Sequence, residues 1–234
     1  MAITDIYDGQ DPQWLALYTY VDASRYLNLP TSTVRAWVKG STYTSGDEKR
    51  VFAPVLAVDS EQKVVKGLSF IDLTELFVLK ALRRDHKVSL ENIRRALRFA
   101  EDKLNIERLL LTDLMTYGGD LFVKIYGDLV NLSRGGQVAL EAVLKESLDR
   151  VDRDDRSTPI TLYPIVEGFG DEKLVSISPR VSFGKPTVAG TGTNTAVIAH
   201  RYEAGETIDE IAFDYDINPH FIKGAISYEY RTAA

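Results

Sequence analysis

A short segment near the N-terminus constrains the fold more than any other part of the sequence. Residues 19–27 carry apolar side chains at helical spacing, and Thr19 with Asp22 follows the pattern of a capping box at a helix start. The segment 28–30 contains a proline that breaks the helix, and 31–39 again shows helical spacing. The sequence therefore predicts two short helices joined by a tight turn, an arrangement with which many proteins enter the major groove of DNA.

The second of these predicted helices has one apolar and one polar face. The apolar face, which we expect to be buried, consists of Val34, Trp37 and Val38. The polar face, which we expect to be exposed, consists of Thr31, Ser32, Thr33, Arg35 and Lys39. Pro30 stands where a capping side chain is usual, and proline has no side-chain oxygen, so we expect Thr31 to cap the helix instead.

A β-hairpin and two longer helices are predicted next. Residues 41–47 are polar and predict a loop, 51–58 predict an edge strand, and 64–65 predict its returning strand. A hairpin that follows a helix-turn-helix is called a wing. Helical spacing then predicts helices over 69–85 and about 89–103. One side of the second of them is basic through Arg94, Arg95 and Arg98.

The overall charge counts against DNA binding until its distribution is considered. The 234-residue chain has a net charge of −6, whereas a nucleic-acid-binding domain is often basic. Up to residue 103 there are 15 Lys and Arg against 14 Asp and Glu, and the remainder has 13 against 20. The acidic excess therefore lies in the second half, away from the predicted helix-turn-helix.

Cysteine content and the N-terminus bear on the compartment. There is no cysteine, which excludes disulfides and thiolate metal sites and permits a reducing compartment. The N-terminus lacks the basic and apolar regions of a signal peptide, and no stretch approaches the roughly 20 apolar residues that span a bilayer. We therefore expect a cytoplasmic protein.

The middle of the chain predicts a hairpin followed by a helix. Residues 121–126 and 129–132 are apolar runs that flank a Gly-Asp pair, which is typical of a two-residue hairpin turn. Residues 137–151 have the spacing of an amphipathic helix, and 160–166 predict a strand. Because this segment has no other evident role, we expect it to supply the contacts of a dimer.

The last sixty residues predict a small helical unit. Residues 174–177 predict a strand, and a loop rich in glycine and proline follows. Three helices are then predicted, over about 194–204, 208–214 and 219–230. The short second helix makes this unit similar in shape to a helix-turn-helix.

No constellation of residues predicts catalysis or a metal site. The three histidines are isolated and lack the spacing of metal ligands: His86, His200 and His220. The acidic residues of 152–155 are neutralised by Arg153 and Arg156, so this run predicts a solvated loop. No serine lies in a nucleophile elbow.

A phosphate-binding loop is also excluded. Gly184-Lys185 lacks the glycine that begins a Walker A motif, and Pro186 stands where Ser or Thr would bind magnesium. These residues predict a tight loop, in which glycine supplies positive φ and proline fixes its own φ. We expect a protein that is not an enzyme and that has no cofactor, catalytic residue or metal.

The order helix, turn, helix, wing and basic helices resembles the DNA-binding domain of MerR-type regulators over about residues 20–103. The first group of matching residues is Tyr20-Val21-Asp22-Ala23, Leu27, Leu29, Thr33-Val34-Arg35 and Trp37. The second group is Leu68-Ser69-Phe70, Leu73 through Leu82, Val88-Ser89-Leu90 and Ile93-Arg94. The resemblance implies a winged helix-turn-helix that binds DNA.

The resemblance also implies which residues contact DNA. Arg35 would bind a phosphate near the start of the second helix, and an alternative for it is a salt bridge within that helix. The polar residues that would face base edges or phosphates are Thr31, Ser32 and Thr33, with Lys39 on the same helix. The wing would carry Lys49 and Arg50. The basic end of the following helix, Arg83 and Arg84, is either solvated or in contact with phosphate.

The C-terminal part resembles the domain of unknown function found in VapB-type antitoxins of type II toxin–antitoxin systems. The matching residues are Ile177 to Val181, Gly184-Lys185-Pro186-Thr187-Val188, Gly190-Thr191, Ala204 to Ile211, Tyr215 and Ile222 to Tyr228. At Gly192 the family typically has a long residue, so any contact made by that side chain is not implied here. The resemblance implies a partner toxin, which we expect to be a PIN-type ribonuclease.

Together these patterns predict an α+β, mainly helical protein. We expect a winged helix-turn-helix over 1–104, a β-hairpin and helix in a linking and dimerisation segment over 105–170, and a tri-helical antitoxin-type domain over 171–234. The predicted function is that of an antitoxin that binds operator DNA as a homodimer and represses its own transcription. Two alternatives stay open: a MerR-like regulator with a small-molecule effector bound in 105–165, and a protein-interaction module that does not bind DNA.

Overall fold

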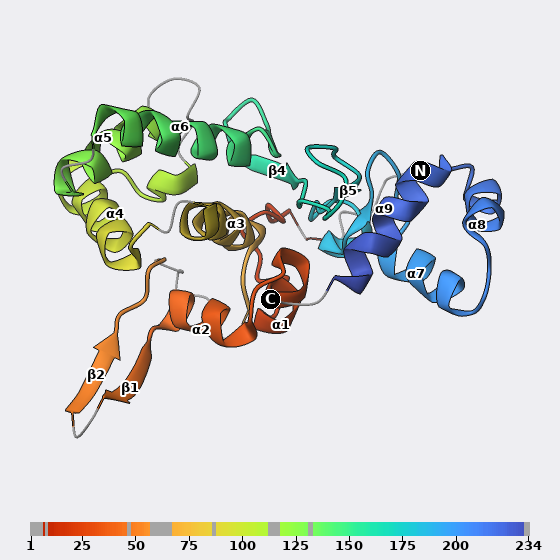
Figure 1. The fold of residues 1–234 in the computed structure, drawn as a ribbon, viewed down its shortest axis with the longest axis horizontal. Coiled ribbons are helices and arrows are strands. Elements are labelled where there is room, and N and C mark those ends of the chain that lie inside the picture. The colour runs from red at the N-terminus through yellow and green to blue at the C-terminus, as the bar shows by residue number, and fades with distance from the viewer. Residues whose placement is uncertain are drawn as a thin grey trace.

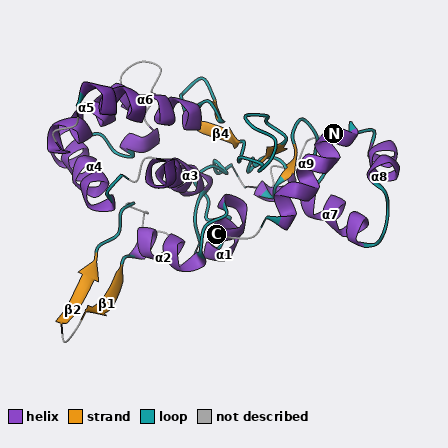
Figure 2. Ribbon diagram, viewed as in Figure 1, coloured by secondary structure: helices purple, strands orange, loops and turns teal. Residues whose placement is uncertain are grey.

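The computed structural model describes residues 7, 9–45, 48–56, 67–85, 88–111, 118–130 and 133–231. Helices predominate, and the strands described form small two-stranded antiparallel sheets (Figure 2). The molecule is elongated, with the β1–β2 hairpin at one end and helices α7 and α8 at the other (Figure 1). The α+β, mainly helical class with an N-terminal helix-turn-helix is confirmed.

The N-terminal elements follow the predicted order. They are α1 (Tyr20–Leu27), α2 (Thr31–Lys39), β1 (Ser41–Ser45), β2 (Glu48–Phe52), α3 (Phe70–Asp85) and α4 (Leu90–Leu104). The predicted capping box forms at the start of α1, because Asp22 N donates to Thr19 Oγ1 over 3.1 Å and Thr19 N donates to Asp22 Oδ2 over 2.9 Å. Asn28 ends α1 in the left-handed conformation with φ 51°. Local hydrogen bonds therefore fix both ends of α1.

The wing is formed by a different segment from the predicted one. The expectation placed 41–47 in a loop and the first wing strand at 51–58, whereas β1 lies in that loop and pairs with β2, Ser41 opposite Phe52. Residues 57–66, with the predicted return at 64–65, lie outside the described residues. A projecting two-stranded ribbon has little core to bury, so its strands need no apolar alternation and polar residues such as Thr42 suffice.

The middle of the chain is helical, so the predicted hairpin over 121–132 is wrong. One helix, α5 (Gly118–Val130), takes its place. Its buried side chains, Phe122, Val123, Ile125 and Tyr126, recur at helical spacing. The glycine expected in a turn lies inside α5 and faces Gln137 of the next helix, whose Nε2 would lie 2.9 Å from a Cβ at Gly127.

The remaining elements agree more closely with the expectations. They are α6 (Arg134–Leu148), β3 (Val151–Arg153), β4 (Pro159–Leu162), β5 (Val175–Ser176), β6 (Thr187–Val188), α7 (Thr195–Glu203), α8 (Ile208–Tyr215) and α9 (Pro219–Tyr230), with short 3-10 turns at Leu109–Leu111 and Ser182–Gly184. The three C-terminal helices are confirmed within two residues at each end. The helix predicted over 137–151 is α6, which ends at Leu148 because Val151 already pairs with Leu162 in a sheet.

Helix α3 forms the centre of the larger core. Its residues from Phe70 to Leu79 are all buried, and α3 lies between α1–α2 on one side and α6 on the other (Figure 1). This core continues from Tyr18 to Ile177 and so crosses residue 104, where we placed the first boundary. A second core joins α7, α8 and α9 around Ile198, Ile211 and Ile222. The domain boundaries themselves stay a prediction.

The C-terminal unit is hydrogen-bonded to the helix-turn-helix. The Tyr228 hydroxyl of α9 donates to Tyr26 O over 3.0 Å, and Arg231 donates to Tyr26 O over 2.6 Å and to Arg25 O over 2.8 Å. These donors bind carbonyls of the last turn of α1, and Arg25 O also accepts from Asn28 N over 3.4 Å. The described ranges contain no helix that is both long and apolar enough to cross a membrane.

Candidate nucleic-acid interface

Helix α2 presents the predicted polar face. Val34 is fully buried and Trp37 and Val38 are 5% and 8% exposed, which confirms the predicted buried side. Of the predicted contact residues, Ser32, Arg35 and Lys39 are exposed, while Thr31 and Thr33 are half-buried. The Lys39 ammonium lies 5.1 Å from the centre of the Tyr20 ring, so α1 supports this side chain through a cation–π contact.

The start of α2 lacks the capping side chain that we expected. Pro30 occupies the N-cap position, and no side chain there accepts a hydrogen bond from the helix. Thr31 does not cap either, because its hydroxyl donates to Ser24 Oγ over 3.0 Å, and Ser24 Oγ donates to Leu29 O over 2.5 Å. The two hydroxyls therefore connect α1 to the turn, and the rigid φ of proline starts α2 without a capping side chain.

Arg35 is exposed on this surface. Within the part of the chain that the structure describes, it forms no salt bridge, so the alternative of a salt bridge within α2 finds no partner there. Arginine that is exposed and unpaired near the beginning of a recognition helix can donate to a phosphate oxygen without first losing an internal partner.

The wing continues directly from α2. Gly40 joins them with φ 74°, and a Cβ there would approach Phe52 O to 2.5 Å, so only glycine fits. Lys49 is exposed and lies opposite Thr44 in the β1–β2 register. The backbone of Arg50 pairs with that of Tyr43. Figure 1 shows the hairpin projecting from the end of α2, so the strand β2, which contains Lys49, extends beyond the helix.

Arg94 of α4 holds the base of the wing, a role that our sequence analysis missed. Its Nε donates to Pro54 O over 2.9 Å, its second terminal nitrogen donates to Ala53 O over 2.6 Å, and its guanidinium carbon lies 4.7 Å from the centre of the Phe52 ring. Two backbone bonds to Trp37 O complete this base, from Val55 N over 2.7 Å and from Leu56 N over 3.2 Å.

The basic end of α3 is less closely connected to this surface. Arg83 is exposed and its guanidinium donates to Val88 O over 3.4 Å, which links the end of α3 to the start of α4. Arg84 is the next residue of α3. Lys80, one turn earlier, donates to Leu27 O over 2.6 Å and so connects α3 to α1. The structure therefore joins α2 and the wing into one surface. The described hydrogen bond of Arg83 connects only the end of α3 and the segment before α4.

A buried ionic cluster fixes α3 from the other side. Arg108 donates to Asp72 Oδ1 over 3.0 Å and to Glu75 Oε2 over 2.5 Å, and both carboxylates are almost fully buried. Asp72 also accepts from Ser69 N over 2.8 Å and so caps the start of α3. Burial raises the pKa of Glu75 to about 7, although the positive charge of Arg108 acts in the opposite direction.

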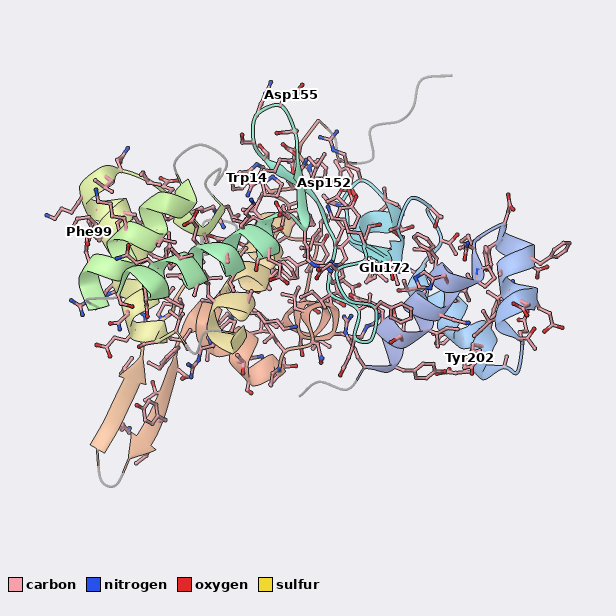
Figure 3. The ribbon with its side chains drawn as sticks, turned by 45° about the horizontal axis from the view of Figure 1, so that its top comes forward. Trp14, Phe99, Asp152, Asp155, Glu172 and Tyr202 are labelled. Carbon is pink, nitrogen blue, oxygen red and sulfur yellow. The ribbon has the colours of Figure 1, made fainter. Side chains whose placement is uncertain are left out.

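Two carboxylates of the acidic run that begins at Asp152 accept hydrogen bonds from within the protein. Asp154 accepts from Arg156 N over 2.9 Å and from Thr158 N over 2.8 Å, and the second of these is the first cause of its lowered pKa. Asp152 accepts from the Tyr163 hydroxyl over 2.7 Å. Asp155 lies at the tip of the same loop in Figure 3. Among the described residues, no group of three or more His, Asp or Glu could hold a metal.

Comparison with known families defines the class of the N-terminal part. Residues 16–97 match the family model described as "Putative DNA-binding HTH domain", a range that includes α1, α2, the wing and α3. This part of the chain is a helix-turn-helix domain. Residues 175–228, which include α7 and α8, match the model described as "Protein of unknown function (DUF433)".

Individual relatives are similar over nearly the whole chain. The chain is 28% identical over 225 residues to "Putative antitoxin VapB45" of Mycobacterium tuberculosis, covering 90% of this chain and 92% of that protein. It is 24% identical over 246 residues to "Uncharacterized protein Rv2308" of the same organism, covering 100% and 96%. The crystal structure of Rv2018 from Mycobacterium tuberculosis matches with a TM-score of 0.64 at 22% identity, covering 91% of this chain and 98% of that one, and so shares the fold.

Proposed function

We propose that this protein is an antitoxin that binds operator DNA through α2 and the wing and represses its own transcription. The observation that carries the DNA-binding part is the exposure of Ser32, Arg35 and Lys39 on α2 and of Lys49 on the adjoining wing of a helix-turn-helix domain. The antitoxin part is supported by the similarity to a protein named as a putative antitoxin and by the motifs of the C-terminal domain.

In this proposal the N-terminal half of α2 enters the major groove. Ser32 and Thr33 face the base edges, and Arg35 and Lys39 bind phosphates on either side of the groove. Lys49 and Arg50 bind the neighbouring backbone through the wing. Each phosphate that a cation neutralises releases counterions, so log K falls with log salt concentration by about 0.9 per contact. One such domain reads few base pairs, which is why we propose a homodimer on a two-fold operator.

The same proposal includes the type of DNA-binding domain, the type of antitoxin and the class of its partner toxin. The wing and basic helices support a MerR-like type of DNA-binding domain, with Arg83 and Arg84 as further phosphate contacts. The C-terminal motifs support a VapB-type antitoxin, and its partner would be a PIN-type ribonuclease. A protein that acts on operator DNA works where the chromosome is, so we propose a cytoplasmic location and a binding role without catalysis.

A small-molecule regulator is the second candidate. A cavity of about 260 Å³ lies below the base of the wing and is lined by Val55, Glu75, Arg98 and Arg108, among others. Ligand pockets usually measure roughly 300 to 1,000 Å³ and are mostly apolar. This cavity is smaller, and two of its charged side chains, Glu75 and Arg108, already bind each other. This cavity therefore gives little support to an effector-binding regulator.

Binding to the promoter of its own gene tests the proposal. We expect a fluorescence anisotropy titration to show tight binding at low salt, and Arg35→Ala to weaken it on every sequence and to lower the salt slope by about 0.9. Arg180→Ala, which removes an exposed arginine from the C-terminal part, is the matched control and leaves binding unchanged. Absence of binding by the wild-type protein at low salt would leave the protein-interaction module as the better account.

A further inference from the structure

The negative charge of this protein is concentrated in 22 consecutive residues. The segment 195–216, which contains α7 and α8, has a net charge of −5, against −6 for the whole chain. Its charged residues are Arg201, Glu203, Glu206, Asp209, Glu210, Asp214 and Asp216. The rest of the chain has 27 basic against 28 acidic residues and is close to neutral. The segment 195–216 therefore accounts for most of the net negative charge of the chain.

The same segment carries a strongly exposed aromatic side chain. Phe213 of α8 is 87% exposed, the highest value among the large apolar side chains that the structure describes. Ile211 and Ala212 on the opposite side of α8 are buried in the C-terminal core, so the rotation of the helix is fixed and Phe213 cannot turn inward. Asp209 precedes Phe213 by four residues on α8, so the two side chains share one face of the helix, and Asp216 is the C-cap residue directly after α8.

Internal ion pairs neutralise only part of this charge. Arg201 binds Glu206, and it also donates to Asp214 over 2.6 Å, which holds α7 against α8. Glu210 caps α8 by accepting from Thr207 N over 2.8 Å. Within the described residues, no Lys or Arg pairs with Asp209 or Asp216. Among the described residues, the exposed ring of Phe213 therefore lies on a helix whose first turn and C-cap carry carboxylates without a basic partner.

The position of α8 leaves the DNA-binding surface accessible. In Figure 1, α8 lies at the end of the molecule opposite the β1–β2 wing, and Tyr202, 43% exposed, is labelled at this end in Figure 3. DNA is repelled by a surface of this charge. A second copy of the chain presenting the same surface is repelled as well, because like charges placed face to face are unfavourable. The negative charge of this surface therefore favours a partner whose binding surface is positively charged.

We infer that the α8 surface, defined by Phe213, Asp209, Glu210 and Asp216, binds the toxin, and that the toxin presents an apolar pocket with a basic rim. This inference rests on the proposed antitoxin function and adds the surface through which it acts. An exposed aromatic side chain that enters a partner's pocket is typical of an interface hot spot, and the charged residues around it steer association. The toxin and operator DNA then bind to opposite ends of the same chain.

The test uses the full-length protein and the purified product of the reading frame adjacent to its gene. We expect Phe213→Ala to weaken their binding by about thirtyfold or more, mainly through faster dissociation. Asp209→Asn with Asp216→Asn slows association and reduces its dependence on salt. Phe183→Ala is the matched control, because Phe183 is also a highly exposed phenylalanine, 68%, and lies outside α8. We expect all these variants to bind operator DNA like the wild type.

The outcomes separate the two proposals. If the wild-type protein does not bind this toxin, the proposed antitoxin function is wrong. If the wild type binds and Phe213→Ala binds equally well, the toxin uses another surface and the inference alone is wrong. Equal losses from Phe213→Ala and Phe183→Ala contradict a site centred on α8.

Discussion

Arg94 offers a direct test of how the wing is positioned for DNA. Arg94→Ala removes two hydrogen bonds from a charged donor to Ala53 O and Pro54 O, and a cation–π contact with Phe52. A hydrogen bond to a charged group contributes about 1.5 to 3 kcal/mol when buried. Arg94 is half-buried and water can replace it, so we expect a total of about 2 kcal/mol to be lost at the base of the wing.

This local loss is expected to appear in DNA affinity. Without Arg94 the wing must be ordered when DNA binds, and an ordering cost of about 2 kcal/mol corresponds to a dissociation constant about thirtyfold higher. Because Arg94 donates to protein carbonyls, its removal leaves the salt slope unchanged. Lys49→Ala, in contrast, removes a proposed phosphate contact and lowers the slope by about 0.9. Fluorescence anisotropy titrations with operator DNA at several salt concentrations measure both quantities.

Two control variants make the test specific. Arg95→Ala removes the same charge from an exposed position of the same helix and is expected to change affinity little. Arg94→Lys keeps the charge but lacks the planar fork that reaches both carbonyls, so it restores binding only in part. If Arg94→Ala lowers the salt slope by about one and Arg94→Lys restores it fully, Arg94 contacts a phosphate, and the argument from wing geometry is refuted.

Two further predictions concern stability. Glu75 has its pKa raised to about 7 in the folded protein, so the folded state binds this proton more tightly than the unfolded state, whose pKa is 4.5. The protonated Glu75 therefore adds about 3 kcal/mol to the free energy of unfolding below pH 4.5. This contribution falls as the pH rises above 4.5 and is gone once the pH has passed through 7. Urea unfolding between pH 5 and 8 should show this loss in the wild type relative to Glu75→Gln, and parallel curves would contradict it. Gly184→Ala places a Cβ against the Tyr18 hydroxyl at a φ of +75°, and we expect it to cost about 2 to 4 kcal/mol from backbone strain and overpacking. Tyr18→Phe removes the colliding oxygen, which has no described hydrogen-bond partner, and should recover part of that loss in thermal unfolding; no recovery would point to strain alone.

The sequence by itself determined the features that depend on local interactions. The capping box of Thr19 and Asp22, the buried side of α2 at Val34 and Trp37, and the three C-terminal helices follow from residues close together in the chain. Hydrogen bonds within one turn and apolar spacing along one helix act over a few residues, so the pattern specifies them without reference to the rest of the fold.

Only the tertiary structure decided the features that depend on distant partners. The apolar run that we expected as a hairpin is α5 because α4 and α6 cover it, and an apolar run alone suits a helix or a strand equally. Arg94 holds the wing through carbonyls some forty residues away, and Phe213 is exposed because the core takes the opposite side of α8. A side chain's partner, or its lack of one, is set by packing between elements, which local sequence does not encode.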